Sequence, residues 1–173
     1  MPTSYVGRLA STESDRTYSQ TSASNLASGS AMATVATILE EKGGTVYSIA
    51  PQSSIAEAVH ELHARRIGVL TVMDGNELVG IISERDIVRH LSEKGAAVLE
   101  AKVVDLMTAT PITCTPSDPL LSILKRMSDG RFRHMPAVEN GQVLGLISIG
   151  DVVKHRLREL EYEALRMKQM IVG

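Results

Sequence analysis

GIISERD, residues 80–86, returns 65 residues later (145 − 80) as GLISIGD, residues 145–151. Sliding the chain by this distance needs no gap and aligns six pairs of identical residues that are typical of turns, caps and charged sites, among other matches. They are Pro51/Pro116, Arg66/Arg131, Gly80/Gly145, Ser83/Ser148, Asp86/Asp151 and His90/His155. Self-similarity at a fixed period indicates a duplicated structural unit. We therefore expect the chain to fold as two copies of one unit.

The two copies share a predicted order of strand, helix, strand, strand, helix. TVYSIAP and PITCTP are typical of short strands that end at proline, which cannot donate a hydrogen bond to a sheet. Paired apolar runs follow, and the turns at Asp74-Gly75 and Asn140-Gly141 indicate hairpins. Each copy closes with a second helix. The pattern predicts an α/β (α+β) fold of two tandem β-α-β-β-α units.

The helix between the strands has a predicted start in each copy. In the first copy, Ser54 and Glu57 have the spacing of a capping box. In the second copy, Asp118 is expected to cap the helix, with Pro119 at the first helical position. The apolar stripe expected to face the first core consists of Ile55, Val59 and Leu62.

Composition limits the class of protein. With 173 residues and 43% apolar composition, the chain can bury the core of one domain or of two small ones. A net charge of -2 gives no strong field toward nucleic acid or anionic lipid. The single cysteine, Cys114, excludes an intrachain disulfide. No apolar run approaches the ~20 residues of a membrane span, and no signal-peptide core is visible, so we expect a cytoplasmic protein without membrane contact.

The chain divides into four predicted segments. Residues 1–31 are rich in Ser and Thr and are expected to form a flexible tail, or an extension upstream of a start at Met32. Repeat 1 is assigned to residues 32–98 and repeat 2 to residues 99–160. Residues 161–173 are predicted to extend the last helix.

The SxxD motif at the strand-to-helix junction has two interpretations. Its spacing is that of a capping box, so Ser83 with Asp86, and Ser148 with Asp151, are expected to cap helices. The same junction directs backbone N–H groups and the positive end of a helix dipole toward an anion, which is the usual arrangement for binding phosphate. One residue set can serve both purposes.

Cations near the motif differ between the copies. Arg85 lies within the first motif and offers a fork that matches phosphate, whereas the second motif has isoleucine and glycine at the intervening positions. We therefore expect two clefts with different ligand preference. RFRHMP places Arg131, Arg133 and His134 together, which predicts an electropositive edge. The arginines of ARRIG are expected to be solvated.

With its doubled signature, the VVDLMT segment at 103–108 and RFRHMPAV at 131–138, the chain from about residue 33 to residue 160 resembles a CBS domain pair, or Bateman module. The resemblance implies two units packed through their sheets about a pseudo-two-fold axis, with two clefts that bind AMP, ADP, ATP, S-adenosylmethionine or NAD(H) as regulatory ligands. It implies no catalysis, no catalytic cofactor and no metal. A homodimer and an unidentified target protein are the partners it suggests.

The resemblance also implies residue roles. The motif's aspartate binds ribose hydroxyls, its serine lies near ribose or phosphate, and the first strand of one repeat faces the signature of the other. In the γ subunit of AMP-activated protein kinase, His and Arg at the basic edge bind phosphate; here their order is reversed. The expected ligand-binding residues are Val46, Tyr47, Ile67, Gly68, Ser83, Arg85, Asp86, Ile112, Thr113, Arg133, His134, Ser148 and Asp151.

Three other functions fit the sequence less well. An enzyme acting on a nucleotide, with a motif aspartate as base, would need a metal or an activated nucleophile that the sequence does not reveal. Nucleic-acid binding through the basic edge fits poorly with the net charge. His60 and His63 have a spacing that can bind metal, but without carboxylate or cysteine partners they are expected to be surface histidines. Cys114 is expected to be a buried strand residue.

The C-terminal segment carries a further apolar pattern. Its a/d spacing covers about two heptads, too few for an independent coiled coil. The stripe either packs on its own module or contacts a second copy, and dimer contact is favoured because the helix extends beyond the repeat. The residues of this seam are Leu157, Leu160, Ala164, Met167 and Ile171.

Overall fold

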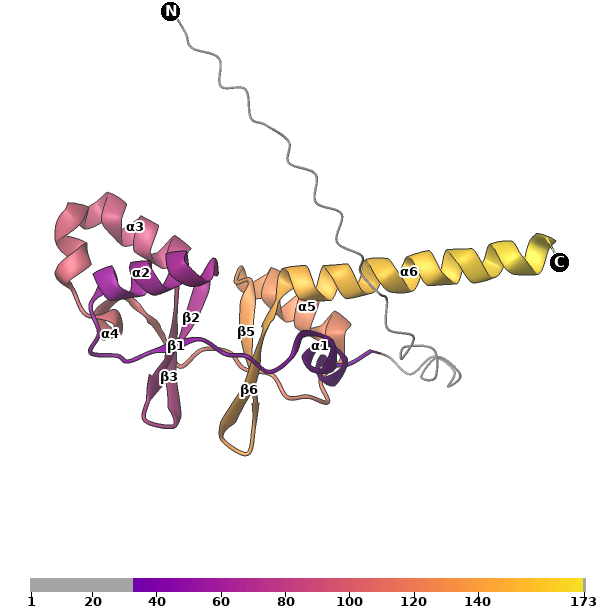
Figure 1. The fold of residues 1–173 in the computed structure, drawn as a ribbon, viewed down its shortest axis with the longest axis horizontal. Helices are drawn as coiled ribbons and strands as arrows, with labels where there is room; N and C mark the ends of the chain where they lie inside the picture. Colours follow the sequence, from indigo (N-terminus) through magenta and orange to yellow (C-terminus); the bar gives the residue numbers. More distant parts are fainter. Residues whose placement is uncertain (1–32, 173) are drawn as a thin grey trace, which may run out of the picture. The chain divides into compact units, whose positions relative to one another are not determined.

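The computed structural model describes residues 33–172, so the segment 1–31 expected to be a tail lies outside the described residues. The elements follow one another in the predicted α+β pattern (Figure 1). Their bounds are α1 Val35–Lys42, β1 Ser48–Ile49, α2 Ile55–Arg65, β2 Val69–Asp74, β3 Glu77–Ser83, α3 Glu84–Lys94, the 3₁₀ segment η2 Gly95–Glu100, α4 Val103–Leu106, β4 Thr108–Ala109, α5 Leu120–Gly130, β5 His134–Glu139, β6 Gln142–Ser148 and α6 Ile149–Val172.

The first repeat is built on a four-stranded sheet of order β1-β2-β3-β4. β1 runs parallel to β2, while β2, β3 and β4 are antiparallel. The hairpin of β2 and β3 shifts register between Val72 and Met73. Its turn contains Gly75 at φ 59, the left-handed conformation that the Asp-Gly signal predicts.

The second repeat keeps the same hairpin but a reduced first strand. β5 and β6 pair antiparallel and shift register between Ala137 and Val138, the position that corresponds to the shift in the first repeat. The strand expected in PITCTP is wrong, because only Cys114 bridges to Ala137 there. This bridge is parallel, as the pairing of β1 with β2 is. Its sulfur and amide both donate to the carbonyl of Pro136, which fixes the segment without a longer ladder.

Two clusters of buried apolar side chains form the cores, one for each repeat. In α2, Ile55, Ala58 and Leu62 face the first core, so the prediction that Val59 belongs to this stripe is wrong; it is 40% exposed. One turn of 3.6 residues after Ile55 falls between Ala58 and Val59, so the period alone does not decide which of the two faces the core.

The starts of the two corresponding helices differ. The capping box of Ser54 and Glu57 is confirmed, with both reciprocal hydrogen bonds formed. The expected cap by Asp118 is wrong, because α5 begins after Pro119 and has no side-chain cap. The Asp118 carboxylate instead accepts from the Thr115 amide at 3.0 Å and pairs with Arg126. It stabilises the turn before the helix.

The segments at the start of the two repeats, the lead-in segments with α1 and α4, are exchanged: each contacts the other repeat. The Val35 amide, at the start of repeat 1, donates to the carbonyl of Asp118 in repeat 2 at 3.0 Å. The Val103 amide, at the start of repeat 2, donates to the carbonyl of Ser53 in repeat 1 at 2.9 Å. Ser53 and Asp118 occupy corresponding positions of the duplication. A reciprocal exchange of this kind is what a pseudo-two-fold arrangement requires.

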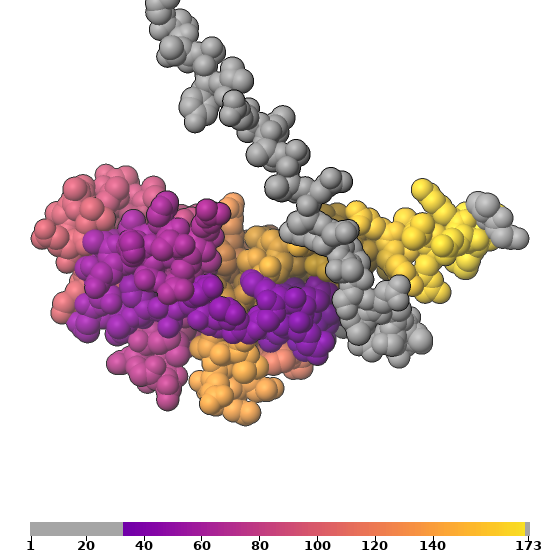
Figure 2. All heavy atoms as spheres, in the orientation of Figure 1, coloured from indigo at the N-terminus to yellow at the C-terminus, as the bar shows by residue number. Residues whose placement is uncertain are grey.

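The exchange changes which core each lead-in helix belongs to. By sequence order α1 was assigned to repeat 1, yet Val35 and Ile38 are buried in the second core. α4 was assigned to repeat 2, yet Val103 and Leu106 are buried in the first. Figure 2 shows the indigo segment that contains α1 against the orange surface of repeat 2. The cores therefore depend on both halves of the chain.

Candidate functional site

A cavity of about 510 Å³ lies where the first signature meets the second repeat. Repeat 1 contributes the ends of β2 and β3 and the first turns of α3. The chain around β4 contributes residues 108 and 110–112, and the link from α5 to β5 contributes residues 130–134. A site of this volume is within the range of small-molecule pockets. Residues 110–112 of the second repeat thus line the same cavity as Ser83 and Asp86 of the first signature.

Asp86 stands at the polar end of the cavity. Its Oδ2 accepts from the Ser83 hydroxyl at 2.6 Å and from the Ser83 amide at 3.1 Å, and the Asp86 amide donates back to Ser83 Oγ at 3.2 Å. This is the predicted capping box of α3. Oδ1 pairs with Arg89 at 3.2 Å, and the carboxylate side chain is 15% exposed. Local capping thus holds one carboxylate oxygen and leaves the other paired with an exposed arginine.

Positive charge is in excess around the cavity. The lining contains four arginines and two carboxylates, those of Glu84 and Asp86. Among the described residues, Arg85, Arg131 and Arg133 form no ion pair within 4.0 Å. Arg131 ends α5 in the left-handed conformation, φ 56, as Arg66 ends α2 at φ 55. Guanidinium groups at such an edge match phosphate oxygens.

The remaining walls are apolar or backbone. Ile112 is 52% exposed and Phe132 is half-buried beside Gly130, where an added Cβ would lie 2.4 Å from the phenyl ring. Of the predicted ligand-binding residues, Gly68 and His134 also line the cavity. Burial, and then the nearby charge of Lys42, lower the pKa of His134 below its usual value, while Asp151 acts in the opposite direction. The imidazole is therefore neutral at pH 7.

The second signature repeats the cap and lies outside the cavity described above. Asp151 Oδ2 accepts from the Ser148 hydroxyl at 2.7 Å and from the Ser148 amide at 2.9 Å. It also accepts from Lys42 Nζ at 2.7 Å, and the same ammonium donates to the Leu146 carbonyl at 3.0 Å. Neither Ser148 nor Asp151 lines the cavity described above.

Four further predicted ligand residues also lie outside this cavity. Tyr47 stacks under the Arg65 guanidinium, 4.5 Å from the ring centroid, and its carbonyl accepts from the amide of buried Thr71. Ile67 packs against the first core. The other two are Val46, which is half-buried, and Thr113, which is exposed and whose carbonyl accepts from Arg126 at 2.6 Å.

Comparison with known proteins identifies the fold family. A family model described as the CBS domain matches twice, at residues 45–93 and 103–158. The chain belongs to the CBS-domain family. Its two matches in tandem make it a CBS domain pair, as the duplicated signature predicts.

Individual relatives agree with this CBS assignment. The mitochondrial CBS domain-containing protein CBSX3 of Arabidopsis thaliana is 32% identical over 155 residues, covering 84% of this chain and 75% of its own. The crystal structure of the CBS-domain protein ATU1752 from Agrobacterium tumefaciens is 41% identical, with a TM-score of 0.70, and covers 72% of this chain and 99% of its own. The CBS domain pair of protein MJ0100, crystallised with 5′-methylthioadenosine and S-adenosyl-L-methionine, has a TM-score of 0.66 at 24% identity, covering 75% of this chain and 99% of its own.

Other features of the CBS pair bear on the remaining expectations. His60 and His63 are exposed on α2, and within residues 33–172 no cluster of three potential metal ligands occurs. No helix in the described part of the chain is long and apolar enough to cross a bilayer. The cytoplasmic location stays a prediction, because the Arabidopsis relative is named as mitochondrial.

Several cavity residues were not predicted from the sequence. Arg89 follows the motif by one helical turn, and this spacing from Asp86 could have indicated it. Thr108 and Thr110 come from the β4 region, which reaches the first repeat through the exchange of lead-in segments. No local pattern marks such residues, since their position depends on a contact made across the duplication.

Proposed function

We propose that this CBS domain pair is a regulatory module that binds a phosphorylated adenosine ligand, AMP, ADP, ATP or NAD(H), in the cavity at Asp86. The observation that carries the proposal is the juxtaposition, in one cavity, of a capped carboxylate and an arginine-rich edge. The Asp86 carboxylate accepts ribose hydroxyls, and the N-terminus of α3 with Arg85 and Arg133 faces the phosphate.

The charge of the cavity favours phosphate over other adenosine ligands. Four arginines against two carboxylates leave a positive excess that attracts an anion. A sulfonium such as that of S-adenosylmethionine brings a further positive charge toward these arginines. The adenine ring is placed against the apolar wall that includes Ile112. The protein MJ0100 was crystallised with adenosine compounds, but its similarity to this chain supports the fold and not the choice of ligand.

Regulation needs a difference in affinity between two states. The cavity joins residues of both repeats, so a ligand that contacts both favours the arrangement in which they lie close together. This change in the arrangement of the repeats is transmitted to a target protein or to a second copy of the chain. We expect a homodimer that uses the exposed seam of α6, and the occupied cavity changes its packing.

Calorimetric titration of AMP, ATP and NADH tests the function. Wild type is expected to bind at least one of them, more tightly than unphosphorylated adenosine. Asp86→Asn should weaken binding at least tenfold, about 1.4 kcal/mol, because the amide presents a donor to the ribose. Asp105→Asn is the matched control: Asp105 forms the corresponding capping interaction in α4 but does not line the cavity.

Two outcomes would contradict the proposal. One is an Asp86→Asn variant that binds as wild type does, and the other is a wild-type chain that binds none of the three nucleotides. To distinguish binding from turnover, the protein is incubated with ATP and Mg²⁺, and the recovered nucleotide is analysed by chromatography. Intact ATP is expected, whereas accumulation of ADP or AMP would make the protein an enzyme.

A further inference from the structure

The carboxylate of the second signature is already engaged by a cation from a distant segment. Lys42 is 109 residues from Asp151 in sequence, and its ammonium lies 2.7 Å from Oδ2, the same oxygen that receives both Ser148 hydrogen bonds. Asp86, in contrast, pairs with Arg89 of its own helix through Oδ1. The two carboxylates therefore have the same cap but different cationic partners.

The position of Lys42 follows from the duplication. Leu39 stands over Gly145, where an added Cβ would lie 2.3 Å from Leu39 Cδ2, just as Met107 stands over Gly80 at 2.5 Å. Lys42 follows Leu39 by about one turn of α1 and donates to the Leu146 carbonyl and to Asp151. The residues that correspond to these two at the first signature, Ile81 and Asp86, line the open cavity, so at the second signature a long cationic side chain lies on the equivalent surface.

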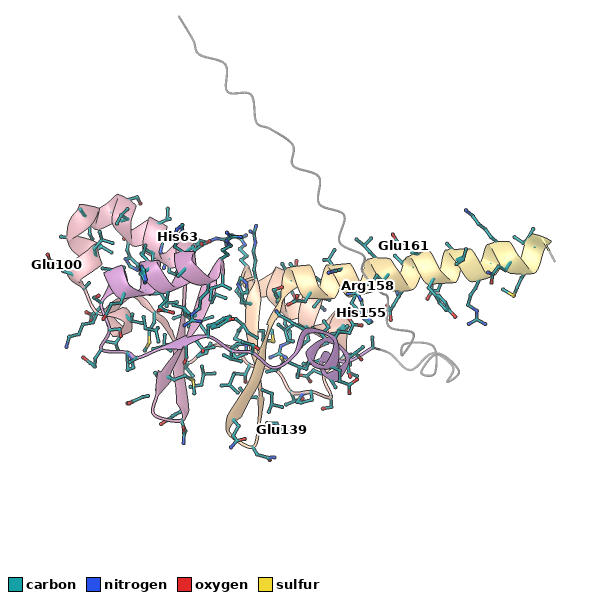
Figure 3. All side chains as sticks on the ribbon, viewed as in Figure 1. His63, Glu100, Glu139, His155, Arg158 and Glu161 are labelled. Atoms are coloured by element: carbon teal, nitrogen blue, oxygen red, sulfur yellow. The ribbon has the colours of Figure 1, made fainter. Side chains whose placement is uncertain are left out.

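The lead-in helix holds Lys42 there. α1 has 8 residues where α4 has 4, and this added length carries Lys42 to the second signature. Beside it, Glu41 pairs with His155 and Arg158 of α6, each at 3.2 Å. Figure 3 labels these two side chains on α6, next to α1.

The chain after α1 adds a backbone contact to the same strand. Gly44 passes so close to β6 that an added Cβ would lie 2.9 Å from the Leu144 carbonyl oxygen. Leu39, Lys42 and Gly44 therefore all approach β6 or its signature. Of the three, Lys42 reaches the part of β6 that corresponds to the cavity wall at Ile81.

The electrostatics of Asp151 agree with this geometry. Burial raises the pKa of the carboxyl, but the hydrogen bonds from Lys42 and Ser148 outweigh it, and the pKa is lowered. A ribose that binds Asp151 must displace the ammonium or share the carboxylate with it. At the first signature a ligand competes only with Arg89, which is 55% exposed and lies at the cavity.

Building on the proposed function, we infer that Lys42 determines ligand number: paired with Asp151, it keeps the second cleft closed to adenosine ligands, so each chain binds one ligand, in the cavity at Asp86. Lys42→Thr removes the ammonium from Asp151 and opens the second cleft. Lys42→Met does the same while keeping most of the apolar stem of the side chain.

The stoichiometry of binding tests the inference. AMP, ATP and NADH are titrated in turn into wild type, Lys42→Thr and Lys42→Met, and native mass spectrometry counts the bound molecules per chain. We expect one ligand in wild type and two in both Lys42 variants. Adding Asp151→Asn to Lys42→Thr should restore one. Lys125→Thr, a change at an exposed lysine of α5, is expected to keep the wild-type count.

The possible failures are distinguishable. Two ligands per wild-type chain would overturn the role of Lys42 and leave the proposed function intact. One ligand in both Lys42 variants, with wild-type melting temperatures, would also overturn it. Absence of binding to every protein would overturn the proposed function itself, and this inference with it.

Discussion

At the scale of single residues, the two signature aspartates separate local from distant effects. The serine hydroxyl lies 2.6 Å from Asp86 Oδ2 and 2.7 Å from Asp151 Oδ2, so the cap is the same in both copies. Four consecutive residues determine it, and the sequence pattern predicted it. The cation that pairs with each carboxylate lies outside this motif. For Asp151 it comes from α1, which precedes the first sheet in sequence but packs in the second core.

The free thiol of Cys114 is predicted to be unreactive. Burial, and next the nearby Asp118 carboxylate, raise the pKa of Cys114 to about 11, and the residue is 2% exposed. About one thiol in a thousand is then ionised at pH 8, and the thiolate is the reactive form. Ellman's reagent at pH 8 should modify the native protein at least tenfold more slowly than the unfolded chain.

The same shift has a defined effect on stability. Because the folded pKa is raised, the folded state holds the proton more tightly. The stabilisation is complete below the ordinary thiol pKa of about 8.5 and is lost as pH rises through about 11. The control for reactivity is Ser117→Cys in a Cys114→Ser background, since Ser117 is exposed in the same loop. Equal rates at the two positions would contradict the prediction.

At the scale of elements, the capping boxes of α3 and α2 allow a cap at the cavity to be compared with a cap away from it. Ser83 caps α3 and lines the cavity, whereas Ser54 caps α2 and does not. Each cap contributes about 1 kcal/mol to the free energy of unfolding. Urea denaturation should therefore show a similar loss for Ser83→Ala and Ser54→Ala.

Ligand affinity should separate these two variants. Ser83 Oγ donates to Asp86 at 2.6 Å, so its removal frees the carboxylate to rotate away from the ribose position. We expect calorimetry to show weaker nucleotide binding for Ser83→Ala and unchanged binding for Ser54→Ala. Equal affinities in the two variants would mean that Ser83 serves the helix alone.

The elements also show how far the sequence could be read. Strand, helix and hairpin order followed from period and turn residues, which act over a few positions. The expected Asp118 cap was wrong because the carboxylate has nearer partners in Thr115 and Arg126. α1 was not predicted as part of the second core, because its burial depends on residues that lie about 80 positions away along the chain.

At the scale of the whole molecule, the exchange of lead-in segments makes one folding unit of two repeats. Val103 is buried in the first core and Val35 in the second, so neither repeat completes its core from its own consecutive residues. The same exchange brings residues 110–112 to the first signature and Lys42 to the second. Duplication therefore gives two related clefts, and a short difference in the lead-in helices makes them unequal.

The exposed face of α6 leads to the prediction of a dimer. The alternative in which the seam packs on its own module does not hold in the structure, because Leu157, Leu160, Met167 and Ile171 are 45% to 83% exposed. Figure 1 shows α6 continuing beyond the hairpin of the second repeat. Burying one methionine in an interface contributes about 1.5–3 kcal/mol. Met167→Glu should therefore weaken self-association at least tenfold in sedimentation equilibrium.

Leu165→Glu is the matched control for this change. Leu165 is 54% exposed and Met167 57%, so the two substitutions remove similar apolar surface and add the same charge. On a helix of 3.6 residues per turn, however, Leu165 points about 160° away from Met167 and about 120° away from the centre of the seam. A dimer through the seam requires the Leu165 variant to associate as wild type does. Equal weakening by both variants would mean that added charge, and not the seam, governs association, and a monomeric wild type would exclude the dimer.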